Sequence, residues 1–155
     1  MQVDPNNAAR GKEAEQSSTF GNAEASRAVD GDEDSGFSGN SCSSTNFDVN
    51  GVGTKNPWWQ VNLVDEYDIA KVQLINRSDR DCFEQEGGHC KNRLQNVTVE
   101  VIKYGETVQD INFVGTVTDH KNFMFHATGN VIRVTLNGSS KILTLCEVNV
   151  QIRTN

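Results

Sequence analysis

Two arginines and an aspartate stand close together in the polar stretch from Asn76 to Leu94. Arg77 and Asp79 are separated by one residue, and Arg93 lies near the end of the stretch. A planar guanidinium donates paired hydrogen bonds to adjacent hydroxyls or to carboxylates, and a nearby carboxylate can fix its orientation through a charge-assisted bond. These residue types predict a site for a polar ligand, with ordinary salt bridges inside a loop as the alternative.

A second group of charged residues forms the run Asp30-Gly31-Asp32-Glu33-Asp34. Closely spaced carboxylates interrupted by glycine resemble a calcium loop, because Ca²⁺ takes about six to eight oxygen ligands from side chains and carbonyls. The spacing is not that of an EF-hand, and no second helix is indicated. Taken alone, the run favours a solvated acidic turn over a metal site.

No set of catalytic residues is recognisable. The histidines, His89, His120 and His126, have no nucleophile placed beside them by the sequence. The motifs of serine hydrolases, zinc proteases, phosphate-binding loops and dinucleotide-binding folds are absent from the sequence. The sequence therefore predicts a binding domain and not an enzyme.

Four cysteines form an even set, at Cys42, Cys82, Cys90 and Cys146. None of them has the CxxC spacing typical of zinc sites, so two disulfides are favoured over a metal. Four cysteines allow three pairings, which the sequence leaves open. Disulfides in turn predict an oxidising compartment.

Three glycosylation sequons point to the same compartment, at Asn76, Asn96 and Asn137, although such triplets also arise by chance and Asn76 borders a strand. The start of the chain shows no signal peptide and is typical of a domain cut from a longer chain. No apolar run approaches membrane-spanning length. We therefore expect a secreted or extracellular domain, compatible with a larger parent chain or an oligomer.

The composition narrows the class of partner. The chain has 155 residues, 35% of them hydrophobic, and a formal net charge of −7. The acidic balance argues against nucleic acid and anionic membranes as partners. The length predicts one domain over residues 1–155, and the low hydrophobic content fits a thin core between two sheets.

The elements that must position the charged groups are short runs in which apolar and polar residues alternate. They span residues 58–63, 69–75, 97–102, 111–117, 122–125, 131–136 and 146–152. One helical turn is expected near residues 25–29, followed by a long polar loop over residues 30–56. With turn residues between the runs, this pattern predicts an antiparallel β-sandwich or jelly roll. Alternation points one of Trp58 and Trp59 into the core.

Several pieces of the chain resemble the F-type lectin (fucolectin) family. They run in family order, at residues 10–18, 25–32, 41–42, 56–63, 76–79, 93–94 and 145–148. The fragments AVDG, PWW and LCEV at these spacings are together specific, and the resemblance covers nearly the whole chain. It implies an eight-stranded antiparallel jelly-roll β-sandwich that binds carbohydrate and contains a structural Ca²⁺.

The resemblance also implies the ligands of that ion. They would be the carbonyls of Arg27, Asp32 and Cys146, the side chain of Asp30, Ser41, and the carboxylate of Glu147. A disulfide between Cys42 and Cys146 is implied as well, and it would tie the long polar loop to the last strand.

For the sugar, the resemblance implies Arg77 and Asp79 as the arginine–aspartate motif and Arg93 as a second basic residue. The histidine of the family falls at Ser44, whose hydroxyl does not have the reach of an imidazole. Phe37, on a neighbouring loop, offers an apolar contact to a sugar face.

The cysteines of this loop also depart from the family pattern. The family commonly has two adjacent cysteines after its arginine–aspartate motif, whereas seven residues separate Cys82 from Cys90. A disulfide between them would close a small loop instead of forming a flat ledge. We expect a glycan ligand, fucose or a related sugar, with His89 or another group in place of the missing donor. The alternative is a non-fucose or sugar-inactive adhesion or protein-interaction module on the same fold.

Overall fold

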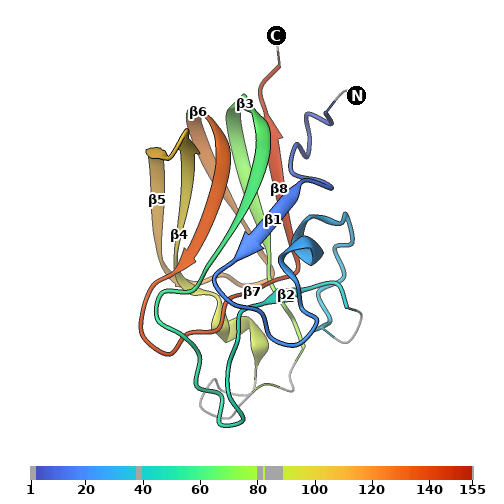
Figure 1. Cartoon of the computed structure of the whole chain (residues 1–155), viewed down its shortest axis with the longest axis vertical. Helices are drawn as coiled ribbons and strands as arrows, with labels where there is room; N and C mark the ends of the chain where they lie inside the picture. The colour runs from blue at the N-terminus through green and yellow to red at the C-terminus, as the bar shows by residue number, and fades with distance from the viewer. Residues whose placement is uncertain (1–2, 38–39, 80–81, 83–88, 155) are drawn as a thin grey trace.

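The computed structural model describes residues 3–37, 40–79, 82 and 89–154. Within this part of the chain, eight β-strands and two short 3₁₀ helices follow one another (Figure 1). In chain order they are β1 (Glu13–Gln16), η1 (Ala25–Val29), β2 (Ser43–Ser44), β3 (Trp58–Ile75), η4 (Cys90–Arg93), β4 (Gln95–Lys103), β5 (Glu106–Thr116), β6 (His120–Leu136), β7 (Thr144–Leu145) and β8 (Glu147–Ile152).

All strand pairs given by the structure are antiparallel. The main sheet has the order β1-β3-β6-β4-β5, with β8 also paired to β3, and β2 and β7 form a small second sheet. The predicted fold class, an all-β antiparallel sandwich of eight strands, is confirmed.

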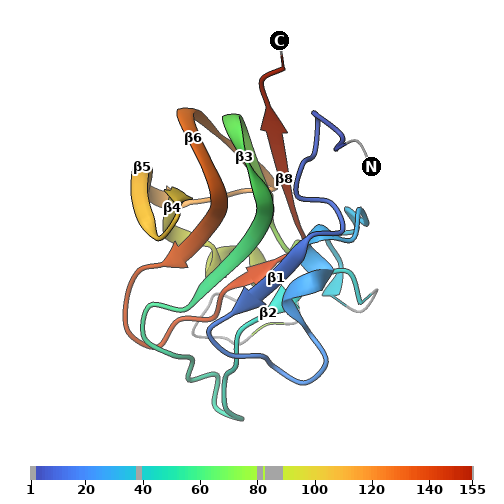
Figure 2. The same cartoon turned by 45° about the horizontal axis from the view of Figure 1, so that its top comes forward.

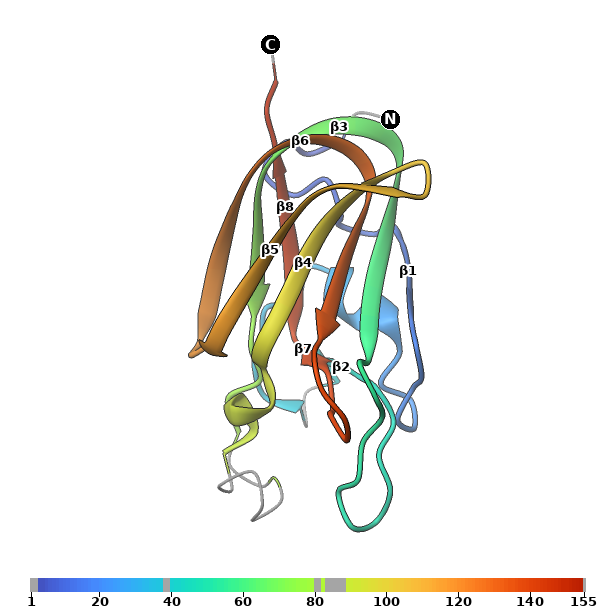
Figure 3. The ribbon, with the colours of Figure 1, turned by 90° about the vertical axis from the view of Figure 1, so that its left-hand side faces the viewer.

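Two pairs of runs expected as separate strands are joined into single long strands. Residues 58–63 and 69–75 both belong to β3, and residues 122–125 and 131–136 both belong to β6. The first half of β3 pairs with β1 and the second half with β8, so β3 belongs to both layers of the sandwich. Figure 3 shows β3 and β6 arching together over one end of the molecule.

The bend has a local cause. The register of β3 against β6 steps from Asn62–Val131 to Tyr67–Gly129, so a bulge in β3 changes the direction of the strand. Gly129 on β6 lies close to the backbone of Ile102 on β4. A Cβ added to Gly129 would lie 2.6 Å from the carbonyl oxygen of Ile102. A glycine is therefore required at this point of the arch.

The core lies between the two layers and follows the alternation of the sequence. On β4, Val97, Val99 and Val101 are fully buried, while the residues between them face outward. Trp59 is the inward member of the tryptophan pair, and its indole Nε1 donates a hydrogen bond of 3.0 Å to the carbonyl of Ala25. This bond fixes η1 against β3.

The end of the sandwich opposite the arch carries the loop that follows β3, together with η1, η4 and the small β2–β7 sheet (Figure 2). Two disulfides hold this end, Cys42–Cys146 and Cys82–Cys90, and both expected pairings are confirmed. At the other end, the N-terminal segment lies along β8, where the amide of Ala8 donates 2.7 Å to the carbonyl of Val150.

Candidate functional site

Arg77 and Asp79 form a bidentate ion pair directly after β3. The Nε of Arg77 lies 2.7 Å from Oδ1 of Asp79, and Nη2 lies 2.9 Å from Oδ2. The preceding residue, Asn76, fixes this turn, because its buried Nδ2 donates to the carbonyls of Lys91, Val117 and Thr118 at 2.8–3.1 Å. The ion pair therefore sits on a backbone that three other segments hold in place.

The pair is packed against an aromatic ring. The guanidinium of Arg77 lies 4.3 Å from the ring centroid of Phe37, and the Arg77 residue is only 7% exposed. Desolvation by burial raises the pKa of Asp79, but the hydrogen bond and the positive charge of Arg77 outweigh it, so the pKa stays below its ordinary value. The carboxylate is therefore ionised at neutral pH and keeps the guanidinium oriented.

Arg93 makes a second cation–aromatic contact at the end of η4. Its guanidinium lies 5.1 Å from the ring centroid of Phe47, which stacks on Phe20 at 4.1 Å. The amide of Cys90 donates 3.0 Å to the carbonyl of Asp79, so η4 is fastened to the loop of Arg77. The structure thus brings the two predicted arginine sites onto neighbouring segments, each arginine over a phenylalanine.

The side chain of Ser44 lies inside the protein. The residue is fully buried in β2, and its Oγ donates 3.0 Å to the carbonyl of Thr45. Its carbonyl accepts the amide of Phe20, and its amide donates to Ala23. The pairing of β2 with β7 accompanies this burial, and a sugar contact from Ser44 stays a prediction.

One aromatic residue of the site was not predicted. Phe47 belongs to the polar loop over residues 30–56. A single aromatic residue among serines, asparagines and glycines was the sequence signal that could have identified it. Of the enlarged loop, Cys82, His89 and Cys90 are described, whereas Asp81 and residues 83–88 lie outside the described residues.

A second group of polar residues surrounds Glu147 at the start of β8. Glu147 is fully buried, and its Oε2 accepts a hydrogen bond of 2.8 Å from the amide of Gly31. Its Oε1 is buried and has no hydrogen-bond partner among the described residues. Desolvation by burial, with the charges of Asp30 and Glu33, raises the pKa of Glu147 to about 8. A buried carboxylate with an unpartnered oxygen is costly unless a cation or a proton compensates it.

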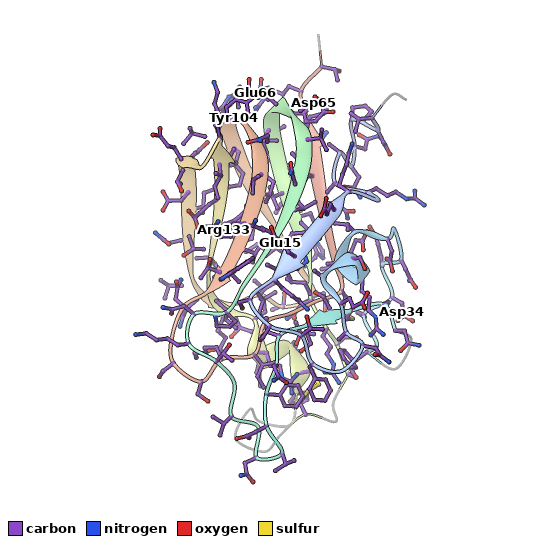
Figure 4. All side chains as sticks on the ribbon, in the orientation of Figure 1. Glu15, Asp34, Asp65, Glu66, Tyr104 and Arg133 are labelled. Atoms are coloured by element: carbon purple, nitrogen blue, oxygen red, sulfur yellow. A yellow bond between two sulfur atoms is a disulfide. The ribbon has the colours of Figure 1, made fainter. Side chains whose placement is uncertain are left out.

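The acidic run winds around this carboxylate in consecutive turns. Oδ1 of Asp30 accepts the amide of Asp32 at 2.9 Å, and Oδ1 of Asp32 accepts the amide of Asp34 at 3.0 Å. The hydroxyl of the buried Ser41 donates to the carbonyl of Asp34. In Figure 4, Asp34 is labelled on this loop, at the right-hand side of the molecule.

The other predicted ligands lie on the segments that meet here. Arg27 lies in the last turn of η1, and Cys146 precedes Glu147 and is joined to Cys42. Within the described part of the chain, no three His, Cys, Asp or Glu side chains form a metal cluster by themselves. An ion at this place would therefore depend on backbone carbonyls as well as on carboxylates.

A cluster of charges at the opposite end of the sheets has no part in this site. The charge of Glu66 raises the pKa of Tyr104, and both residues lie at the arch with Asp65 (Figure 4). Glu66, Tyr104 and Asp65 all lie at the end of the sandwich opposite the loops that carry Arg77 and Arg93.

The fold and this site define the class of protein, which is a β-sandwich lectin domain. The family model of the NedA-like, galactose-binding domain matches residues 27–140. Fucolectin from Anguilla anguilla is 30% identical over 158 residues, which cover 95% of this chain and 90% of that protein. The chain belongs to the fucolectin (F-type lectin) family.

Solved structures agree with this assignment. The lectin domain of lectinolysin, in complex with Lewis B antigen, is 32% identical, with a TM-score of 0.84 over 98% of this chain and 100% of that one. A fucose-binding module of Streptococcus pneumoniae is 26% identical, with a TM-score of 0.81 over 99% of this chain and 100% of that one. These relatives are lectins and carbohydrate-binding modules, which confirms the prediction of a binding domain and not an enzyme.

Proposed function

We propose that this domain binds a fucose-containing glycan at a site built from Arg77, Asp79, Arg93 and Phe37. The observation that carries the proposal is the bidentate Arg77–Asp79 pair on the face of Phe37. The ligands named for the relatives support it, since they are a Lewis B antigen and fucose.

The geometry of the pair suits a sugar. Vicinal hydroxyls need donors and acceptors at fixed positions, and the planar fork of an arginine held by a carboxylate is such an arrangement. Because Asp79 and the Phe37 ring already hold the guanidinium, little side-chain entropy remains to be lost on binding. The aromatic rings offer apolar area for the C–H face or methyl group of a 6-deoxy sugar.

Ca²⁺ is the structural part of the proposal. The residues fit such an ion, because Glu147 brings a buried oxygen with no partner among the described residues. Asp30, Asp32 and Ser41 add further oxygens on the loop whose Gly31 amide binds Glu147. Oxygen donors of this kind are those that Ca²⁺ prefers. The ion would neutralise the buried charge and hold the acidic loop on β8. Elemental analysis of the purified domain tests whether calcium is bound.

The sugar proposal is tested by a glycan array followed by titration of the strongest binder. We expect affinity in the millimolar to micromolar range, as for a shallow polar site, or about −4 to −8 kcal/mol. Replacing Arg77 by Ala should abolish the signal, and Arg77→Lys should still lose about tenfold or more, because an ammonium does not reproduce the paired donors.

Arg133→Ala is the matched control. Arg133 also lies over an aromatic ring, at 5.7 Å from Trp58, and its Nε donates 3.0 Å to Gln60, but it belongs to the sheet and not to the loops. This variant should bind as the wild type does. An array on which no glycan binds would argue for an adhesion module without sugar activity. Equal losses in Arg77→Ala and Arg133→Ala would argue that the sugar does not bind at Arg77.

We further propose that the domain works outside the cell. Two disulfides support an oxidising compartment, and no helix in the described part of the chain is long and apolar enough to cross a membrane. Detection of the protein in extracellular fluid and not in cell extracts would test this.

A further inference from the structure

The three sequons of the chain differ sharply in their folded surroundings. Asn76 is only 1% exposed, and its Nδ2 already donates to three backbone carbonyls. Asn137 is exposed, but its Nδ2 donates 2.9 Å to the carbonyl of Asn96 and 2.8 Å to the hydroxyl of Thr98. A sugar on either nitrogen would break bonds that hold the loops, and at Asn76 it would also have no space.

Asn96 is different, because its amide oxygen is fixed and its amide nitrogen is not used. It is an exposed residue near the start of β4, in the left-handed region with φ 58°. Its Oδ1 accepts a hydrogen bond of 3.1 Å from the amide of Gly115. Its Nδ2 has no hydrogen-bond partner among the described residues. The side-chain amide of Asn96 therefore bonds the protein through its oxygen, and its nitrogen is the atom left for modification.

The neighbouring strand provides room at this position. The register of β4 on β5 steps from Gln95–Thr116 to Val97–Phe113, so Asn96 faces two residues, Val114 and Gly115. Gly115 has no side chain to fill the space beside the amide, and Val114 is 86% exposed. An exposed apolar valine next to the amide would be covered by the first sugar of an attached glycan.

We propose that Asn96 carries an N-linked glycan when the chain passes through a glycosylating secretory pathway. The donor is an oligosaccharide carried on a lipid pyrophosphate. Nδ2 forms a bond to the anomeric carbon, the carbon–oxygen bond to the pyrophosphate breaks, the lipid pyrophosphate leaves with the electron pair, and one amide proton is lost. The amide keeps Oδ1 and one N–H, so the hydrogen bond from Gly115 survives the modification.

Transfer takes place on the extended chain, and the fold then selects which modified chains reach the native state. A chain modified at Asn76 cannot bury that residue and should be retained as misfolded. A chain modified at Asn137 loses at least one of the two bonds to the Asn96–Thr98 segment. The folded, exported population should therefore carry its glycan at Asn96.

The test is secretion of the chain from cultured eukaryotic cells behind a standard leader, with peptide mass spectrometry and treatment with an N-glycosidase. We expect a glycan on the Asn96 peptide of the secreted protein and a mobility shift on deglycosylation. Asn96→Gln should lose this shift. Asn137→Gln should keep it, and so should Thr98→Ser, which preserves the sequon. Secreted protein without a glycan at Asn96, an unchanged shift in Asn96→Gln, or folded protein modified at Asn76 would overturn the proposal.

Discussion

Replacing Glu147 by Gln should change how the stability of the domain depends on pH and on Ca²⁺. In the absence of an ion, burial raises the pKa of Glu147 from 4.5 to about 8. A carboxyl whose pKa is raised by folding contributes its full stability below the unfolded pKa of 4.5. That stability is lost as the pH rises toward 8.

The size of the effect follows from the difference between the two pKa values. At about 1.4 kcal/mol for each pH unit, the cation-free protein should lose about 4–5 kcal/mol between pH 4.5 and pH 8. For a domain of this length, each kcal/mol corresponds to about 2–4 °C in melting temperature. A fall of about 8–20 °C in melting temperature is therefore expected. A bound Ca²⁺ favours the ionised carboxylate and should remove most of the loss.

Thermal melting at several pH values, with chelator or with excess Ca²⁺, measures this. In chelator at pH 8, Glu147→Gln should melt above the wild type, because the amide has no buried charge and still accepts the Gly31 amide through its oxygen. In Ca²⁺ the order should reverse, because the variant has lost an ionic ligand. The same pH profile in both proteins, or no effect of Ca²⁺ on the wild type at neutral pH, would refute this account of Glu147.

Three further variants test the site and the scaffold. Asp79→Asn should weaken glycan binding about tenfold in a titration, because the guanidinium of Arg77 loses its charged partner. In the wild type, binding should stay constant from pH 7 to pH 5, because the pKa of Asp79 is lowered and its carboxylate stays ionised. Replacing Cys42 and Cys146 together by Ala should lower the unfolding free energy by up to about 4–5 kcal/mol in chemical denaturation, because the bond closes a loop of 104 residues. Trp59→Phe should cost about 1–3 kcal/mol in the same assay, because it leaves the buried carbonyl that accepted the indole without its donor.

The sequence predicted the strands well because one face of each is buried. Alternation identifies Val97, Val99 and Val101 as inward residues without any tertiary information. It could not show that residues 58–63 and 69–75 form one strand, since the polar residues of the bulge interrupt the pattern. The continuity of β3 depends on pairing with β6 and on the close approach at Gly129, which are tertiary facts.

The site was predictable where residue type decides the chemistry. Arg77 and Asp79 stand two positions apart after a strand, and this spacing allows the ion pair that the structure contains. The burial of Ser44 could not be predicted, because its side-chain direction depends on the pairing of β2 with β7, and a strand of two polar residues shows no alternation. Phe47 was missed for a related reason, since an isolated aromatic in a long loop has no periodicity to indicate its direction.

The chain order of the site has a consequence for biosynthesis. Cys146 forms a disulfide to Cys42, and its amide donates 2.9 Å to the carbonyl of Ile75, immediately before the turn of Arg77. The end of the sandwich that carries the arginines is therefore complete only after β8 has been translated. A nascent chain that lacks its last strand should therefore lack the two bonds that fasten the turn of Arg77 to Cys146 and to the polar loop.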